Sequence, residues 1–421
     1  MVSIWAYLFL TKKYIPLPSI YIFVYTAWIG FFVSIAVLLI VSKKNLALAL
    51  FAAGIMLGFF TISPYNVGMK IWETLIDPSI VLLAAAMGII PLIGGALEIS
   101  GKMDDLVNNL RIGKKPFLMF SPAMIGMLPM PGGALLSAPL VEKGGAGVNP
   151  ENKAALNVWF RHAFLLIYPL SAFLIVSAKI ANLKVYTVLP YLLPFFVFTV
   201  LLGYLFFLRN ADGKIKYPKK FSLKKLLLPL LVIMIAPVLD FLIQDIFELP
   251  VREISLVIAV VVSFILAFVL GNLSLSSAKH ISKKMKPWNF AFIIIGMFIF
   301  INIFKASGVP ESIAGLTLPN IMLCVFISFL LGIVTGRVEV PASIVIPTYL
   351  ATSGLSSMSP LIFVITFFSI FIGYVISPVH PCVAVSGEYF KIKYQDFLKV
   401  VFLPAFIALL LMFVLSLFFI R

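Results

Sequence analysis

Long apolar segments separated by short polar stretches run through almost the whole chain. A helix needs roughly 20 apolar residues to cross a bilayer, and windows of this kind predict ten transmembrane helices. The predicted helices span Ser19–Val41, Leu46–Thr61, Ser79–Ile99, Ala154–Ala178, Tyr186–Leu208, Leu226–Phe247, Ile254–Leu270, Phe290–Phe304, Leu361–Val385 and Phe397–Ile420. This pattern predicts an all-α polytopic membrane protein.

Two further apolar segments, Pro116–Val141 and Asn320–Leu350, are broken in the middle. The first carries Pro129-Met-Pro-Gly-Gly133 at its centre. Because proline lacks a backbone donor and clashes with the preceding turn, no straight helix can pass through it. Irregular backbone at membrane depth is tolerated only inside protein or along a wet cavity. We therefore predict two re-entrant hairpins, which in paired positions point to a transporter's binding site.

The two halves of the chain share spaced residues as well as hydropathy. Three matches lie 207, 208 and 209 residues apart: Ser100-Gly101 with Ser307-Gly308, Pro139 with Pro347, and Tyr168-Pro169 with Ser377-Pro378. Regular spacing of this kind indicates an internal repeat. We predict an N-terminal segment (1–18), repeat 1 (19–208, hairpin 116–141), a basic linker (209–225) and repeat 2 (226–421, hairpin 320–350). Five crossings in each repeat would invert the second repeat relative to the first.

The distribution of positive charge predicts the sidedness of the chain. With the N-terminus outside, the inner loops carry 21 of the 32 Lys and Arg residues and the outer loops carry 8. Basic residues collect in cytoplasmic loops, so this orientation in the cytoplasmic membrane is predicted, with the linker 209–225 inside. The net charge of +16 therefore indicates topology. Nucleic-acid binding is not expected, because no soluble domain is available to carry it.

Composition narrows the chemistry further. The chain is 62% hydrophobic and 11% charged, and its two cysteines, Cys324 and Cys382, both lie in apolar segments. Such cysteines are usually small buried hydrophobes, so we predict no disulfide, metal or cofactor. Neither a His-Glu-x-x-His nor a Gly-x-Ser-x-Gly motif occurs, and the chain is predicted not to be an enzyme. A passive channel, or less favourably a membrane-embedded hydrolase, remains the alternative.

The string Leu128-Pro-Met-Pro-Gly-Gly-Ala-Leu-Leu-Ser-Ala-Pro-Leu-Val141, with the two predicted inverted halves, resembles the ion transporter superfamily. That group includes gluconate permeases, citrate and divalent-anion symporters, and arsenite and sodium/proton antiporters. The string is most similar to an uncharacterised, largely prokaryotic family of integral membrane proteins. The resemblance implies an elevator-like carrier that forms a homodimer. The Ser-Asn-Thr hairpin tips of the divalent-anion symporters are absent, so dicarboxylate and sodium specificity do not carry over.

Ionisable side chains at membrane depth usually face a cavity or a partner. Arg337 and Glu339 flank the tip of the second broken segment, and Arg suits the bidentate recognition of carboxylate or phosphate. An internal pair that only fixes the loop is the alternative for these two residues. The other ionisable candidates at membrane depth are predicted to serve ion coupling together with Glu339: Arg161, His162, Asp240 and His380. A hydrogen-bonded packing role is the alternative for the two histidines. Asp240 could either pair with Arg161 or titrate.

Helix breaks supply the remaining candidates. Breaks at Tyr168-Pro169 and Ser377-Pro378 would leave half-helix N-termini in the membrane, where partial positive charge favours anions. The predicted substrate-binding residues, with Arg337 and Glu339, are Pro131, Gly132, Gly133, Ser137, Ser171, Ser343 and Ser377. The sequence therefore predicts a secondary transporter for a small anionic solute such as a carboxylate. Its coupling ion is predicted to be a proton, preferably carried by His380, with sodium as the alternative.

Overall fold

The computed structural model describes residues 17–420 except 129, 131, 132, 210, 216, 218, 219 and 317. Every regular element in these residues is a helix. In chain order the helices are α2 (Leu17–Ser42), α3 (Leu46–Thr61), α4 (Pro64–Ile76), α5 (Pro78–Ile99), α6 (Lys102–Asn109), α7 (Lys114–Gly126), α8 (Gly133–Gly144), α9 (Pro150–Ala163), η1 (Phe164–Leu166), α10 (Ala172–Ile180), α11 (Val185–Gly203), η2 (Tyr204–Leu208), α12 (Leu223–Ile246), α13 (Glu253–Leu270), α14 (Leu275–Met285), α15 (Pro287–Ala306), α16 (Val309–Ala314), η3 (Met322–Ile327), α17 (Ser328–Thr335), α18 (Glu339–Ser353), α19 (Pro360–Ile376), α20 (Pro381–Phe390) and α21 (Tyr394–Phe419). The predicted N-terminal segment falls almost entirely outside the described residues.

Eight stretches of the described residues are helical, long and apolar enough to cross a membrane. Two predicted spans differ from single straight helices. Ala154–Ala178 is divided into α9, η1 and α10, and Leu361–Val385 is divided into α19 and α20. Pro169 and Pro378, which cannot donate a backbone hydrogen bond, stand at these two breaks.

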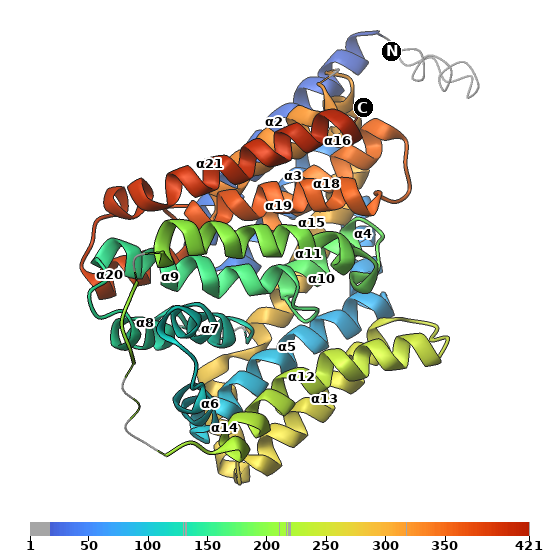
Figure 1. Cartoon of the computed structure of the whole chain (residues 1–421). Helices are drawn as coiled ribbons and strands as arrows, with labels where there is room; N and C mark the ends of the chain where they lie inside the picture. The colour runs from blue at the N-terminus through green and yellow to red at the C-terminus, as the bar shows by residue number, and fades with distance from the viewer. Residues whose placement is uncertain are drawn as a thin grey trace.

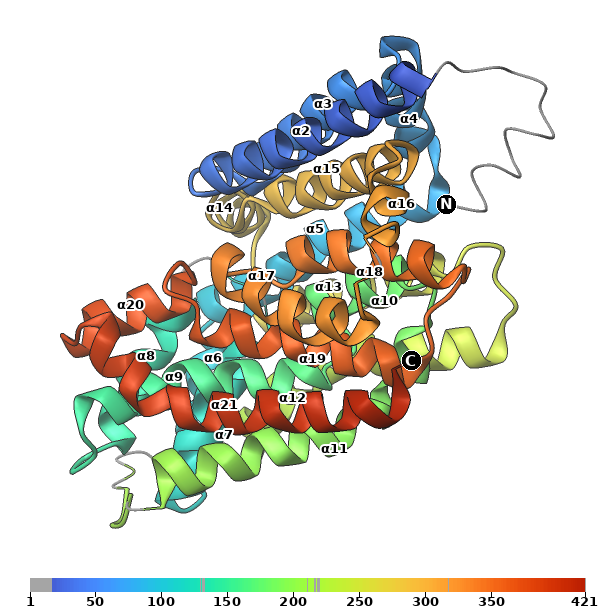
Figure 2. The same cartoon turned by 90° about the horizontal axis from the view of Figure 1, so that it is seen from above.

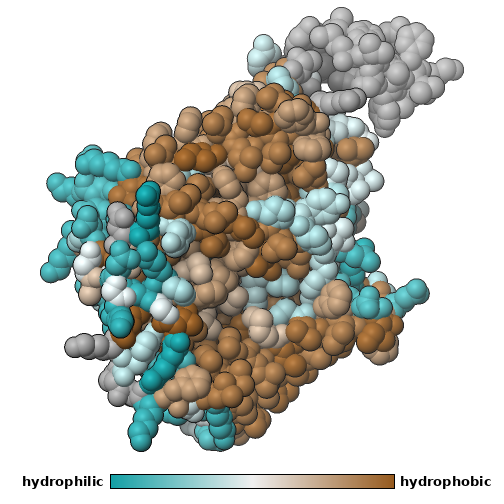
Figure 3. All heavy atoms as spheres, viewed as in Figure 1, coloured by the Kyte–Doolittle hydropathy of each residue, from teal (hydrophilic) through white to brown (hydrophobic). Residues whose placement is uncertain are grey.

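Many large hydrophobic side chains are exposed on the surface. Figure 3 shows hydrophobic residues over most of the visible face, with a polar edge on the left, where α6, α8, α14 and α20 lie in Figure 1. Exposed large hydrophobic side chains such as Phe59, Val269 and Phe418 would be costly in water and belong in lipid. The prediction of an all-α polytopic membrane protein is therefore confirmed.

The helices form two groups by their mutual contacts, which we call the outer group and the inner group. The outer group contains α2–α6 and α12–α15, packed successively through α2, α3, α15, α5, α13 and α12. The inner group contains α7–α11 and α17–α21, and α16 contacts both groups. In Figure 2, α2, α3 and α15 lie along one edge of the molecule, and α11 and α21 lie along the opposite edge.

The same order of elements occurs twice along the chain. In each half, two long helices, a short amphipathic helix, a third long helix and a one- or two-turn helix precede a helix pair, a broken helix and a final long helix. Ser100-Gly101 and Ser307-Gly308 hold equivalent places, since Gly101 and Gly308 have φ of 70° and 72° and each precedes the short helix α6 or α16. Glycine adopts this left-handed conformation without steric cost. The inverted relation of the halves and their proposed limits stay predictions.

Candidate functional site

A cavity of about 390 Å³ lies where the two helix pairs meet the two broken helices. In the first pair, α7 ends at Gly126 and α8 begins at Gly133, and in the second pair residues 336–338 join α17 to α18. Within the second half, α17 packs directly on α19, because the backbones of Gly332 and Gly373 touch the facing helix and leave no room for a side chain. The residues that line the cavity include Gly133, Arg161, Ser171, Arg337, Glu339 and Cys382.

Two arginines from different halves of the chain reach this cavity. Arg161 comes from α9 and is 6% exposed, whereas Arg337 comes from the turn before α18 and is half-buried. No described carboxylate lies within 4.0 Å of either guanidinium. One nitrogen of Arg161, Nη1, is buried without any hydrogen-bond partner. The cavity therefore holds two positive charges that no side chain neutralises directly.

Gly133 makes room for Arg161. It is the first residue of α8, and a Cβ atom built there would overlap the guanidinium of Arg161. This predicted site residue thus acts by having no side chain. Its predicted neighbours Pro131 and Gly132 lie outside the described residues.

Glu339 supplies the negative group of the cavity. It begins α18, and its Oε2 accepts a hydrogen bond from the backbone N–H of Val338 at 3.3 Å. The alternative of an Arg337–Glu339 ion pair does not hold, because no such pair forms within 4.0 Å. With two arginines and one carboxylate, the lining retains a formal positive charge when all three are ionised.

The four predicted serines differ in what their hydroxyls do. Ser137 donates to the carbonyls of Gly133 and Ala134 at 3.2 Å, and Ser343 donates to that of Val340 at 2.7 Å, so both serve their own helices. Ser377 donates to the carbonyl of Ile333 at 2.5 Å and ties the broken helix to α17. Only Ser171, among these four, lines the cavity with its hydroxyl unpartnered.

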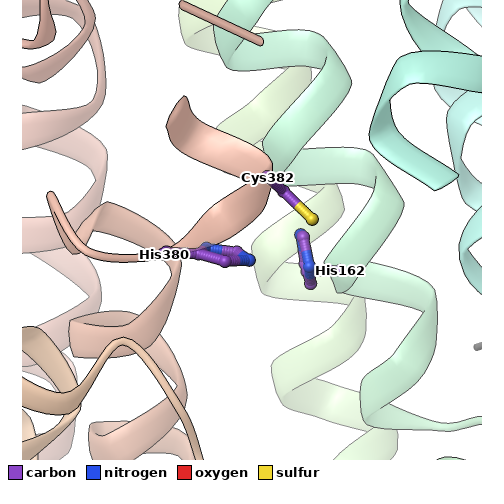
Figure 4. A group of neighbouring side chains, drawn as sticks. All are labelled: His162, His380 and Cys382. Carbon is purple, nitrogen blue, oxygen red and sulfur yellow. The ribbon is translucent and has the colours of Figure 1, made fainter. Parts of the chain in front are cut away.

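His162 and His380 come together beside the cavity, with ring centroids 4.7 Å apart. His162 Nδ1 lies 2.6 Å from the carbonyl of Val158, while both ring nitrogens of His380 are buried without a hydrogen-bond partner. Cys382 joins them, and Figure 4 shows its sulfur and the ring of His380 pointing toward the ring of His162. The sequence analysis did not place Cys382 with the histidines, although the short spacing His380-Pro-Cys382 after a helix break brings two of these side chains together.

Asp240 lies elsewhere. It lines a separate cavity of about 520 Å³ and accepts hydrogen bonds from Tyr186, Gln244 and Ser255 at 2.6–2.9 Å. The suggested pairing with Arg161 is therefore not formed, because three neutral donors already hold the carboxylate. At this second cavity Lys179 of α10 pairs with Glu253 of α13 and bonds Ser79 of α5, which connects the inner group to the outer group.

The chain is similar to a solved transporter structure and to one protein family. The crystal structure of the Alcanivorax borkumensis YdaH transporter, described as having an unusual topology, is similar with a TM-score of 0.56 and 15% identity over 87% of this chain and 95% of that chain. No curated protein matches the chain. The family described as "Protein of unknown function (DUF401)" matches residues 26–419. The chain therefore belongs to the DUF401 family.

Proposed function

We propose that the protein is a secondary active transporter that binds a small anionic solute, such as a carboxylate, in the central cavity. The observation that carries the proposal is the convergence of Arg161 and Arg337, both without a carboxylate partner, on one largely buried space. A buried charge is costly unless it is paired. An anion held by both guanidinium groups would supply that pairing, and each group can donate two parallel hydrogen bonds.

Helix ends add to the attraction for an anion. The breaks leave the N-termini of α10 and α20 at the level of the cavity, with Ser171 and His380 as their N-cap residues. Unpaired N–H groups at a helix start carry partial positive charge. The unpartnered hydroxyl of Ser171 would donate to the solute. Transporters place their substrates at such discontinuous helices.

We further propose that the inner group of helices carries the solute past the outer group in an elevator-like movement, within a homodimer in the lipid bilayer. The two-group arrangement, the repeated order of elements and the likeness in fold to the YdaH transporter support this. Coupling would use a proton or a sodium ion. Glu339 is the candidate for either, because it lies in the cavity without an arginine partner. The solute leaves chemically unchanged.

A binding assay tests the proposal first. Purified protein is heated with a panel of carboxylates, sugar acids and oxyanions, since a ligand of the folded state raises apparent stability. We expect one class to raise the melting temperature. The variant Arg337→Ala would lose charge-assisted hydrogen bonds worth about 1.5–3 kcal/mol. Its affinity for the stabilising anion should therefore be about 10- to 100-fold weaker than that of the wild type.

The matched control is Arg252→Ala, because Arg252 is exposed and lines the second cavity instead. The control should bind like the wild type. Equal affinities of Arg337→Ala and the wild type for the stabilising anion, with both proteins folded, would reject the proposed site.

A further inference from the structure

We propose that His162, His380 and Cys382 form a binding site for one zinc ion at the edge of the central cavity. A ring nitrogen of each histidine and the sulfur of Cys382 all lie within 4.8 Å of one another. Tetrahedral zinc, with bonds of about 2.1 Å to nitrogen and about 2.3 Å to sulfur, holds its ligand atoms roughly 3.5 Å apart. Closing the difference needs side-chain movements of about 1 Å. Imidazole and thiolate are the ligand types that zinc prefers.

The hydrogen bonding of both histidines fits metal binding. The Val158 carbonyl can only accept, so His162 Nδ1, 2.6 Å from it, carries the proton and leaves Nε2 free to coordinate. Metal-binding histidines usually donate the N–H of the ring nitrogen that does not hold the metal to a carbonyl or carboxylate, as Nδ1 of His162 does here. His380 is 1% exposed, and the nearby backbone of Tyr374 does not meet hydrogen-bond geometry with either ring nitrogen. Buried polar atoms without a partner are rare, and a bond to a metal ion would give one of the two ring nitrogens of His380 a partner.

The surroundings hold these ligands in place. The ring of Tyr374 packs on that of His380 with centroids 4.1 Å apart. His380 and Cys382 stand at the N-cap and second position of α20, so the helix start fixes both. Arg161 and Cys382 line the same cavity, so the guanidinium would lie near the thiolate that metal binding requires.

The three protein ligands leave a fourth position open. His162 and Cys382 line the central cavity, so that position faces the space in which the proposed anion binds. Sites with three protein ligands and an open position accept water or a substrate group there. Histidines held by zinc do not shuttle protons, which leaves Glu339 as the proton-coupling candidate.

Zinc binding can be measured directly on the full chain after removal of any purification tag. Separate samples of protein freed of metal by chelation are titrated with Zn²⁺ and with Co²⁺, and the absorption spectrum of bound Co²⁺ reports thiolate bonding and four-coordination. We expect one ion per chain and a thiolate-to-cobalt charge-transfer band. Cys382→Ala and His380→Ala should each weaken binding by about 100-fold or more, because even supporting residues of metal sites account for 10- to 100-fold.

The chain provides matched controls. It contains three histidines and two cysteines, so His280, exposed on α14, and Cys324, buried on η3, are the remaining residues of each type. His280→Ala and Cys324→Ala should bind zinc like the wild type. Gel filtration establishes that each variant is folded before the titration.

Two outcomes overturn the inference. One is the absence of stoichiometric zinc in the folded wild type. The other is zinc binding that Cys382→Ala and His380→Ala leave unchanged. Either result, combined with anion stabilisation that still depends on Arg337, would remove the metal site and leave the proposed transport function standing.

Discussion

The guanidinium of Arg161 occupies the space that a side chain at position 133 would fill. Replacing Gly133 by Ala should push this flexible group aside while costing the fold little, because the atoms in the way are the far end of a long side chain. We expect at least about tenfold weaker binding of the stabilising anion, the loss of one charge-assisted hydrogen bond, with a nearly unchanged melting temperature.

The control for Gly133→Ala is Gly68→Ala in α4, where a Cβ atom meets nothing within 4 Å. Alanine is the better helix former there, so this control should keep full affinity. Wild-type affinity in Gly133→Ala would show that the placement of the guanidinium is not decisive.

Charged site residues could be predicted from the sequence because a charge at membrane depth is costly in free energy. Arg161, Arg337 and Glu339 stood out because charge at membrane depth requires a cavity or a partner, and all three line the cavity. Cys382 did not stand out, because its neighbour His162 is 220 residues away in the chain. Hydrophobic periodicity carries no information on such distant contacts, and for the same reason it left open whether Asp240 pairs with Arg161 or titrates.

The turn between α17 and α18 touches the break between α19 and α20. Gly336 has φ of +57°, and a Cβ atom there would lie 2.9 Å from the backbone of Val379 and His380. Gly336→Ala should therefore be destabilised twice, by roughly 1–2 kcal/mol for the left-handed conformation and by about 1–3 kcal/mol for the overlap.

Gly354→Ala isolates the first of these two effects. Gly354 has φ of +63° but no atom within 4 Å of its added Cβ. Thermal unfolding in detergent should give a clearly lower melting temperature for Gly336→Ala than for Gly354→Ala. Equal melting temperatures would mean that the turn and the break are not in tight contact.

The long helices could be predicted from hydropathy, whereas the short helices could not. Prolines at the breaks of Ala154–Ala178 and Leu361–Val385 marked where helices end, since they remove a backbone donor. The amphipathic helices α4 and α14 lie in polar connections for which hydropathy predicts no helix. Their formation depends on packing against neighbours such as α15 and α5, and tertiary packing overrides weak local propensity.

At the scale of the whole molecule, two groups of helices meet around the central cavity. In the part of the chain that the structure describes, polar bonds between the groups come from Tyr168 and Tyr186, which bond α12, and from Lys179, which pairs with Glu253 and bonds Ser79. The repeated order of elements could be predicted from the 207–209-residue spacing. The division into an inner and an outer group could not, because it arises from contacts between the halves.

Transport into proteoliposomes tests the central claim most directly. The anion that most stabilises the protein is supplied outside, with an inward gradient of either protons or sodium. A carrier should accumulate the anion above its outside concentration in a saturable manner with one of these gradients. Arg337→Ala should abolish accumulation, and Glu339→Gln should retain solute exchange but lose the gradient-driven component. Flux that only equilibrates the anion, does not saturate and persists in Arg337→Ala would contradict the account.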